Sequence, residues 1–399
     1  MNILVITPTY PSTLADKKGA TPVVHYFTKE WIQLGHTVTV LHLCTQYPSF
    51  FYTLSRPFQK FLSSKLGHLI ISIPPRGGDE VMDGVNVVHR NYTKIIPHSR
   101  FGKSEFSHII DDVNVLINEV KPSIVIGHWD LPQLEILFNI KKEHNIPTFL
   151  VLHGGYERLL KRYGKGYFDL INSLTGLGFR SLPALNNYID MFGNVDNSFM
   201  AMSGVSNLFL NREKKTRNFL CPNNLIFVGA LIKRKHPLEV VDAAIQTFDK
   251  DFTLSFVGTG VEKNSIVKKY PDIIDKQVKF TGRIERNAIV EKLDESDIFV
   301  MISKGEVFGL VYLEAMARGC ITIASRNEGV DGIIVDGQNG FLCEAGNVNE
   351  LAAIFNRIIT MAPAERRKIS QNAINTVVNY SDRKVAERYL DEVCSLINK

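Results

Sequence analysis

The sequence predicts an α/β protein made of two Rossmann-like domains, on the strength of three observations. Short runs of β-branched and apolar residues alternate with stretches in which apolar residues recur at helical spacing, a pattern typical of parallel α/β layers. The alternation occurs in two series, which a polar and charged stretch at 211–218 separates. The chain has 399 residues, enough for two or three domains of roughly 150 residues each. We therefore expect domains at 1–210 and 211–380, followed by a C-terminal helix at 381–399.

The elements of the first half follow from local patterns. A loop rich in proline and glycine at 7–20 separates the first strand from a helix over 24–34, in which apolar residues recur at helical spacing and which Gly35 ends. The later strands are too continuously apolar to be amphipathic, so we expect both faces of their sheet to be covered. The strands are expected at 2–6, 38–43, 123–126 and 148–152.

The second half repeats the alternation and ends in helices. The region 363–399 has a helical pattern, which Tyr380 and Ser381 interrupt. Each run of apolar and β-branched residues before it is short enough for a buried strand of a parallel sheet. The strands are expected at 225–228, 254–257, 278–281, 297–302, 321–324 and 340–342.

The composition excludes several classes of function. A content of 45% apolar and 22% charged residues is ordinary for a globular protein. The net charge of +5 fits an anionic substrate or membrane surface, but no dense tract of Lys and Arg interleaved with aromatic residues predicts nucleic-acid binding. The five cysteines are scattered and form no Cys-x-x-Cys pair, so we expect neither a disulfide framework nor a zinc site.

Targeting signals are the basis for the expected location. The N-terminal apolar run lacks a basic region and is too short for a signal peptide. Residues 31–55 carry no formal charge, but glycine, histidine and proline interrupt them, so they fit a helix end and a strand better than a membrane span. Aromatic residues mix with Arg and Lys at 50–76, which fits a membrane interface, sugar stacking or an internal hydrophobic cluster. We expect a cytoplasmic protein, with peripheral contact at the inner face of a membrane left open.

The segment 306–319, EVFGLVYLEAMARG, carries the main functional signal. Glu306 and Glu314 lie there in one of the most apolar stretches of the chain. A helix that is apolar on every side is expected to be buried, and an unpaired buried carboxylate costs several kcal/mol. Each glutamate therefore needs a partner, either sugar hydroxyls that donate to it or cations from elsewhere in the chain.

The residues around the two glutamates carry a family resemblance. With Phe308, Gly309 and Leu310 between Glu306 and Glu314, and with AMARGC after them, the segment resembles the paired-glutamate signature of the family 4 retaining glycosyltransferases. The resemblance is strong in the second half of the chain and loose in the first. It implies a GT-B fold, in which two Rossmann-like domains face a cleft and the final helix returns to the N-terminal domain. It also implies that Glu306 holds the donor sugar, that Glu314 binds the two ribose hydroxyls, and that the three residues between them offer backbone contacts to the donor.

A basic loop follows the first strand of the second half. Gly229 allows close approach of the backbone to a ligand, and Lys233, Arg234 and Lys235 suit a diphosphate. The loop resembles the family's basic loop, in which an arginine follows the glycine, although Ala230 stands at that position here. Lys235 matches the family's lysine, and either Lys233 or Arg234 supplies the second charge. A solvated basic turn is the alternative interpretation.

Three glycine turns are further candidates for the donor site. Gly258, after the strand at 254–257, begins a dinucleotide-like pattern whose third glycine is absent, so an ordinary turn between strand and helix is the alternative. Gly19, followed by Ala20, resembles the family's glycine-rich loop near the donor diphosphate. If a helix begins near Gly309, its free N–H groups face the phosphates as well.

Two histidines end strands of the first half, where ligands of parallel sheets bind. His153 ends the run at 149–152 and precedes two glycines, and it resembles the family's active-site histidine, which orients the donor sugar. His128 ends the run at 124–127, and a core or surface role is the simpler interpretation for it.

Together these residues predict a metal-independent, retaining glycosyltransferase that acts in surface polysaccharide or glycolipid synthesis. It would move a sugar from a nucleotide-diphosphate sugar to a hydroxyl acceptor, with Glu306, His153 and Lys235 as catalytic residues. The sequence has no Asp-x-Asp pair to hold a divalent cation beside the diphosphate, so we expect no metal and no cofactor besides the UDP- or GDP-linked donor. The expected partners are this donor and a saccharide or lipid-linked saccharide acceptor, with no nucleic acid.

Two other functions fit parts of the same pattern. A sugar-nucleotide epimerase of the same architecture would release free nucleotide without any acceptor. A non-catalytic binding module for nucleotide sugars is favoured by Ala230 and by Gly332, where the family often has a glutamate, but the intact glutamate pair argues against it.

Overall fold

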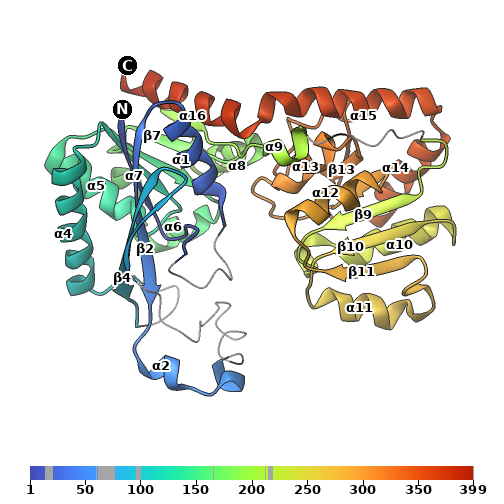
Figure 1. The fold of residues 1–399 in the computed structure, drawn as a ribbon, viewed down its shortest axis with the longest axis horizontal. Helices are drawn as coiled ribbons and strands as arrows, with labels where there is room; N and C mark the ends of the chain where they lie inside the picture. Colours follow the sequence, from blue (N-terminus) through green and yellow to red (C-terminus); the bar gives the residue numbers. More distant parts are fainter. Residues whose placement is uncertain are drawn as a thin grey trace. The chain divides into compact units, whose positions relative to one another are not determined.

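The described chain forms two compact units, each built around one β-sheet (Figure 1). The first unit contains 1–179, 194–201 and 386–399, and the second contains 180–193 and 202–385. A computed structural model gives the coordinates. It describes residues 1–13, 21–59, 61, 77–95, 100–164, 166–211, 213 and 219–398.

The sheet of the first unit has eight strands in the described residues. They are β1 (Asn2–Thr7), β2 (Thr37–Gln46), β3 (Gly78–Met82), β4 (Val85–Thr93), β5 (Ile124–His128), β6 (Thr148–Leu152), β7 (Gly176–Phe179) and β8 (Ser198–Met200). Their order across the sheet is β3-β4-β2-β1-β5-β6-β7-β8. All neighbours pair in parallel except β3 and β4, which form an antiparallel hairpin at one edge. The four strands expected from continuous apolar runs are confirmed as β1, β2, β5 and β6.

Four strands of this sheet, β3, β4, β7 and β8, were not among the expected ones. The edge strand β3 is partly exposed and carries Asp79 and Glu80, and β8 has only three residues. Strand β7 contains two glycines because its neighbours approach closely. A Cβ on Gly176 would lie 2.9 Å from side-chain atoms of Phe149, and one on Gly178 would lie 2.6 Å from the ring of Phe199. Glycine thus lets aromatic side chains pack across β7.

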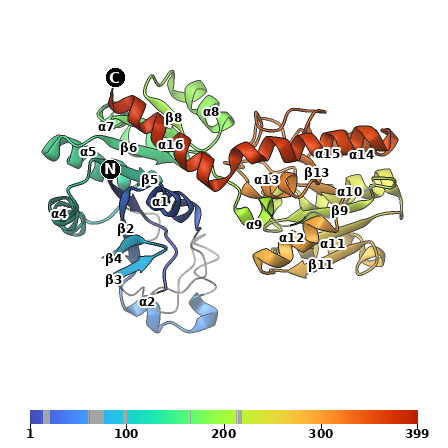
Figure 2. The same ribbon diagram turned by 45° about the horizontal axis from the view of Figure 1, so that its top comes forward.

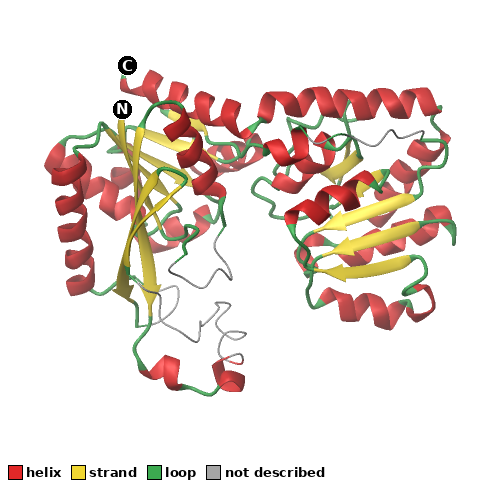
Figure 3. Ribbon diagram, in the orientation of Figure 1, coloured by secondary structure: helices red, strands yellow, loops and turns green. Residues whose placement is uncertain are grey.

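Helices flank the strands of this sheet (Figure 3). They are α1 (Val23–Gln33), α2 (Phe50–Thr53), α4 (Lys103–Val120), α5 (Gln133–His144), α6 (Tyr156–Tyr163), α7 (Gly166–Asn172) and most of α16 (Asp382–Ile397). Helix α16 packs on α1 (Figure 2). Trp31 Nε1 donates to the carbonyl of Ala386 at 3.0 Å, and the ring of Tyr389 lies edge-on to Phe27 and Trp31. Among the described helices, none combines the length and apolar character needed to cross a bilayer.

The sheet of the second unit is parallel throughout, with six strands in the described residues. They are β9 (Asn224–Val228), β10 (Thr253–Val257), β11 (Val278–Gly282), β12 (Ile298–Val300), β13 (Ile321–Ser325) and β14 (Phe341–Cys343). Their order is β11-β10-β9-β12-β13-β14. All six strands were expected within two residues of these bounds, because each is a short buried apolar run.

Eight helices of the described residues belong to the second unit. They are α8 (Leu182–Phe192), α9 (Asn207–Leu210), α10 (Pro237–Phe248), α11 (Glu262–Lys269), α12 (Arg286–Asp294), α13 (Leu310–Ala317), α14 (Val348–Thr360) and α15 (Pro363–Val377). Helix α10 packs against α14, and α13 against α15. The expected break near Tyr380 and Ser381 is confirmed, since it separates α15 from α16.

One buried ion pair ties three of these helices together. The fully buried guanidinium of Arg318, which follows α13, donates to both carboxylate oxygens of Asp294 in α12, at 2.8 and 2.9 Å. It also donates to the carbonyls of Phe209 in α9 and of Glu213, at 3.0 and 2.7 Å. These four bonds satisfy the guanidinium in a place where an unpaired charge would be costly.

Candidate active site

The predicted helix after Glu306 forms as α13, and a left-handed glycine begins it. Gly309 has φ of 78° and directly precedes the helix. Tyr312 fixes this turn, because its ring lies where a Cβ on Gly309 would sit and its hydroxyl donates to the carbonyl of Met301 at 2.9 Å. The turn directs the free N–H groups of the first turn of α13 away from the helix body, where an anion can accept from them.

Glu314 is buried inside α13 beside a cation from another helix. Its side chain is hydrogen-bonded by Arg286 Nη2, and the residue is only 7% exposed. Burial raises the pKa of the Glu314 carboxyl from 4.5 to about 6, and the nearby guanidinium opposes the rise. A cation from elsewhere in the chain is therefore one partner of this carboxylate, which was the alternative to sugar hydroxyls. A carboxylate has about four lone-pair directions, so Glu314 can accept hydrogen bonds from hydroxyl groups as well as from Arg286.

Glu306 lies in the loop before α13 and meets two cations of the basic loop. Its Oε2 is 3.1 Å from Lys235 Nζ and 3.7 Å from Arg234 Nη1. Arg234 is also within 3.5 Å of the carbonyl of Lys304 and 3.4 Å of that of Gly305. Lys233 is exposed in the same 3₁₀ turn, η1 (Lys233–Lys235). The geometry thus brings Arg234, rather than Lys233, to the glutamate together with Lys235.

Glycines hold the ends of β9 and β10 close together. A Cβ on Gly258, whose φ is 137°, would lie 2.0 Å from the carbonyl oxygen of Gly229. A Cβ on Gly260 would likewise lie 2.1 Å from the carbonyl oxygen of Leu231. Gly229 itself lies beside Lys235, since a Cβ there would be 3.3 Å from Nζ. Gly258 is therefore required by the close approach of the two backbones, whereas Gly229 leaves room for the ammonium group of Lys235.

The other predicted donor-site residues of the second unit lie around the same loop. Phe308 is buried, with the guanidinium of Arg180 5.8 Å from the centre of its ring, and Leu310 opens α13 as a half-buried residue. Because the side chains of Phe308 and Leu310 are apolar, these residues can hydrogen-bond a ligand only through their backbone groups.

Sequence reasoning missed two residues that support the pair of glutamates. Arg286, described above, is one of them. The other is Glu328, whose carboxylate accepts from the backbone N–H of Gly305 at 2.9 Å and of Glu306 at 2.7 Å. Glu328 follows strand β13, and its position after the carboxyl end of a parallel strand was the available signal.

The two strand-end histidines of the first unit contact each other. His128 Nδ1 lies 3.1 Å from His153 Nε2, and the ring of Trp129 stacks on that of His153 with centroids 4.0 Å apart. Gly154 and Gly155, with φ of 85° and 77°, turn the chain away immediately after His153. This stacked pair leaves His153 half-buried at the carboxyl ends of β5 and β6. Gly19, the remaining predicted donor-site residue, lies outside the described residues.

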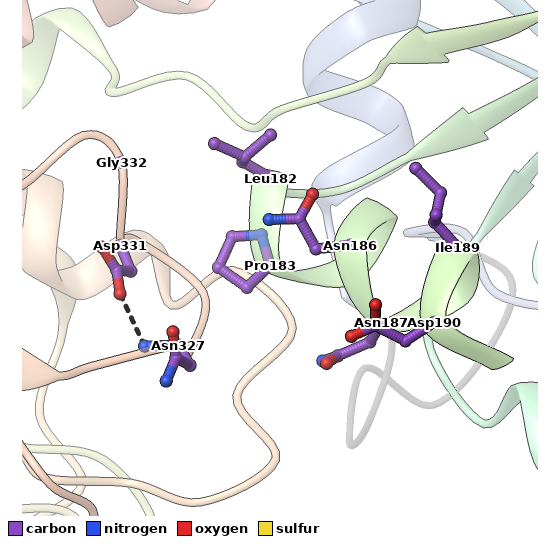
Figure 4. Close-up of a pocket in the computed structure, with 9 residues that line it drawn as sticks. All are labelled: Leu182, Pro183, Asn186, Asn187, Ile189, Asp190, Asn327, Asp331 and Gly332. Carbon is purple, nitrogen blue, oxygen red and sulfur yellow. Dashed lines mark hydrogen bonds between the residues drawn. The ribbon is translucent and has the colours of Figure 1, made fainter. Parts of the chain in front are cut away.

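A cavity of about 570 Å³ lies within the second unit, between α8 and the turn at 327–332 (Figure 4). Helix α8 forms one wall and the turn at 327–332 forms the other, where the N–H of Asn327 donates to Asp331 at 2.6 Å. The lining residues are mostly amides and carboxylates: Asn186, Asn187, Asp190, Asn327 and Asp331, with Leu182, Pro183, Ile189 and Gly332. Such groups can hydrogen-bond a ligand rich in hydroxyls.

Comparison with known proteins shows what the second half of the chain is similar to. Residues 211–376 match the sequence model of a family described as glycosyl transferases group 1. An uncharacterized glycosyltransferase of Methanocaldococcus jannaschii is 26% identical over 276 residues, which are 67% of this chain and 73% of that protein. The N-acetyl-alpha-D-glucosaminyl L-malate synthase of Bacillus anthracis is 35% identical over 130 residues, which are 32% of this chain and 34% of that enzyme.

Solved structures share the whole fold at low sequence identity. A sucrose-phosphate synthase from Thermosynechococcus elongatus covers 100% of both chains with a TM-score of 0.73 and 14% identity. HepE from Anabaena, solved in complex with UDP, covers 99% of this chain and 100% of its own with a TM-score of 0.67 and 16% identity. The expected GT-B fold is thereby confirmed. The family match over 211–376, the relatives and the fold together support a place for the chain among the group 1 glycosyltransferases.

Proposed function

We propose that this protein is a metal-independent, retaining glycosyltransferase of family 4 that transfers a sugar from a nucleotide-diphosphate sugar to a hydroxyl acceptor. One observation carries the proposal. A carboxylate, Glu306, lies with Lys235 and Arg234 beside the N-terminus of α13, which contains the buried Glu314. Cations and a helix N-terminus match a diphosphate, and carboxylates match the hydroxyls of sugar and ribose.

Each residue has a role in the proposed reaction. Lys235 and Arg234 meet the charge that develops on the leaving diphosphate, together with the N–H groups at the start of α13. Glu306 holds hydroxyls of the donor sugar, and Glu314 accepts hydrogen bonds from the ribose hydroxyls. In the first unit, His153 stays a predicted catalytic residue.

The bond changes follow from retention without a covalent nucleophile on the protein. The bond from the anomeric carbon to the leaving phosphate oxygen breaks as the acceptor oxygen attacks the same face. The departing diphosphate takes the proton of the acceptor hydroxyl, so one glycosidic bond forms and one nucleoside diphosphate is released. The protein cations lower the barrier by stabilising that diphosphate.

Related proteins support the donor and acceptor classes. HepE was solved with UDP, with UDP and glucose, and with UDP-glucose, which favours a UDP-linked sugar as donor here. A lipopolysaccharide core biosynthesis glycosyltransferase of Rhizobium meliloti is 25% identical over 169 residues, which favours a surface glycan as acceptor. The polar cavity beside α8 is a suitable place for saccharide hydroxyls.

The test is release of nucleoside diphosphate from UDP- and GDP-sugars, with EDTA present, with and without a pool of saccharide and lipid-linked saccharide acceptors. The proposal expects release that depends on the acceptor, persists in EDTA, and gives a product whose anomeric configuration by NMR is that of the donor. Inversion, or dependence on added metal, would contradict it. Release without any acceptor would favour the epimerase, and binding without release would favour the non-catalytic module.

A further inference from the structure

Three potential metal ligands meet in the sheet of the first unit. His42 and Cys44 are two residues apart in β2, so their side chains lie on the same face of the strand. His89 lies directly opposite His42 on the parallel strand β4. His42 Nδ1 is 2.9 Å from His89 Nδ1, and Cys44 Sγ is 3.5 Å from the former and 4.0 Å from the latter. All three residues are less than 9% exposed. These donors belong to one unit and are independent of the glycosyltransferase site.

Hydrogen bonds hold both imidazole rings in the orientation that a metal ligand needs. His89 Nε2 lies 2.7 Å from the carboxylate of Glu80, which also accepts from the backbone N–H and the hydroxyl of Thr13. The His42 ring is hydrogen-bonded to the backbone of Pro8. Because His42 Nδ1 faces the other two side chains, we assign this bond to Nε2.

The two Nδ1 atoms therefore face each other as acceptors. When Nε2 of a neutral imidazole carries the proton, Nδ1 has only a lone pair. Two lone pairs 2.9 Å apart repel each other unless a proton or a metal ion lies between them.

The triangle of donors has nearly the size that zinc requires. Tetrahedral Zn²⁺ binds nitrogen at about 2.0–2.1 Å and sulfur at about 2.3 Å, which places two nitrogens about 3.3 Å apart and nitrogen and sulfur about 3.6 Å apart. The observed separations of 2.9, 3.5 and 4.0 Å differ from these values by less than half an ångström each. The bond from His89 to Glu80 is the carboxylate–histidine arrangement that commonly orients a zinc ligand.

We propose that His42, Cys44 and His89 bind one Zn²⁺ ion, with Glu80 orienting His89. Three protein donors leave one position of a tetrahedral ion for a water molecule. Binding requires the Cys44 thiolate, so the ion displaces the thiol proton. The ion would join β2 to β4 and, through Glu80 and Thr13, to the chain that follows β1. The widely spaced cysteines gave no sign of such a site, because its ligands come from two strands.

The experiment is a titration of the purified, chelator-treated full-length protein with Co²⁺, followed by Zn²⁺. Tetrahedral Co²⁺ bound to a thiolate gives a sulfur-to-metal charge-transfer band in the near ultraviolet. The proposal expects this band to saturate at one equivalent and to disappear when Zn²⁺ displaces the cobalt. It should be lost in Cys44→Ser and retained in Cys221→Ser, which removes an exposed free cysteine.

Circular dichroism of each variant shows whether it is folded. If Cys44→Ser does not fold, the wild-type titration and Cys221→Ser still decide the question. A wild-type protein that shows no thiolate band with several equivalents of Co²⁺ would overturn the proposal, and a proton shared by the two histidines would then be the cation. A band that Cys221→Ser removes would also overturn it, because the metal would be held at the surface.

Discussion

Replacing Glu314 by glutamine should change how the stability of the second unit depends on pH. Burial raises the pKa of this carboxyl from 4.5 to about 6. The folded protein therefore holds the proton more tightly than the unfolded chain does. The stability that this provides is fully present below pH 4.5 and is lost as the pH rises through about 6. At about 1.4 kcal/mol per pKa unit, the loss is about 2 kcal/mol.

Glutamine has no proton to release, so it avoids this loss. We expect the difference in unfolding free energy between Glu314→Gln and the wild type to shift by about 2 kcal/mol in favour of the variant between pH 4 and pH 7.5. Arg286, which loses its charged partner, is 37% exposed in its side chain and can be solvated. The change therefore isolates the cost of the buried charge better than removal of a cation would.

The assay is urea unfolding followed by far-UV circular dichroism at both pH values. Both tryptophans, Trp31 and Trp129, belong to the first unit, so their fluorescence identifies the transition of that unit separately. Glu295→Gln is the control, because this exposed glutamate pairs with Lys292 on the surface and should show no shift. An identical difference at pH 4 and pH 7.5 for Glu314→Gln would refute the reasoning, since Glu314 would then titrate as an ordinary carboxyl.

Three further outcomes are expected. Lys235→Ala should weaken donor binding about 10- to 100-fold in isothermal titration, because a charge-assisted hydrogen bond contributes about 1.5–3 kcal/mol, while Lys233→Ala should bind almost as the wild type does. Equal effects of the two would contradict the placement of these side chains. Arg318→Leu should lower the unfolding free energy by about 3–5 kcal/mol in urea titration, since it leaves Asp294 buried and unpaired; a loss below about 1 kcal/mol would count against the buried pair. His153→Ala should lower kcat about 100-fold in the transfer assay with donor affinity unchanged, and unaltered turnover would exclude a catalytic role.

Much of the fold could be predicted because its signals are local. The strands of the second unit are short buried runs, and Gly309 marks the start of α13 through its own left-handed backbone. Strand β7 could not be predicted, since Gly176 and Gly178 contribute no side chains to an apolar pattern. The reason for those glycines lies in Phe149 and Phe199, which reach the same place only after the sheet has formed.

The site was predictable where a residue carries its own signal and not where it depends on a partner. The charge of Lys235 and the buried setting of the glutamates are visible in the sequence. The partner of Glu314 is not, because Arg286 lies 28 residues earlier and meets it only in the folded unit, where α12 and α13 both contact α9. The same holds for His42 and His89, which are 47 residues apart and face each other through the register of two strands.

The central claim is that the second unit binds a nucleotide-diphosphate sugar through its glutamates and basic loop. Isothermal titration of the metal-free wild type with UDP-, GDP-, ADP- and dTDP-sugars, in EDTA, tests it most directly. The account predicts one site for one class of donor, binding at least 10-fold weaker in Lys235→Ala and in Glu314→Ala, and unchanged binding in Glu295→Gln. Absence of binding to every donor, or binding that Lys235→Ala and Glu314→Ala leave intact, would contradict it.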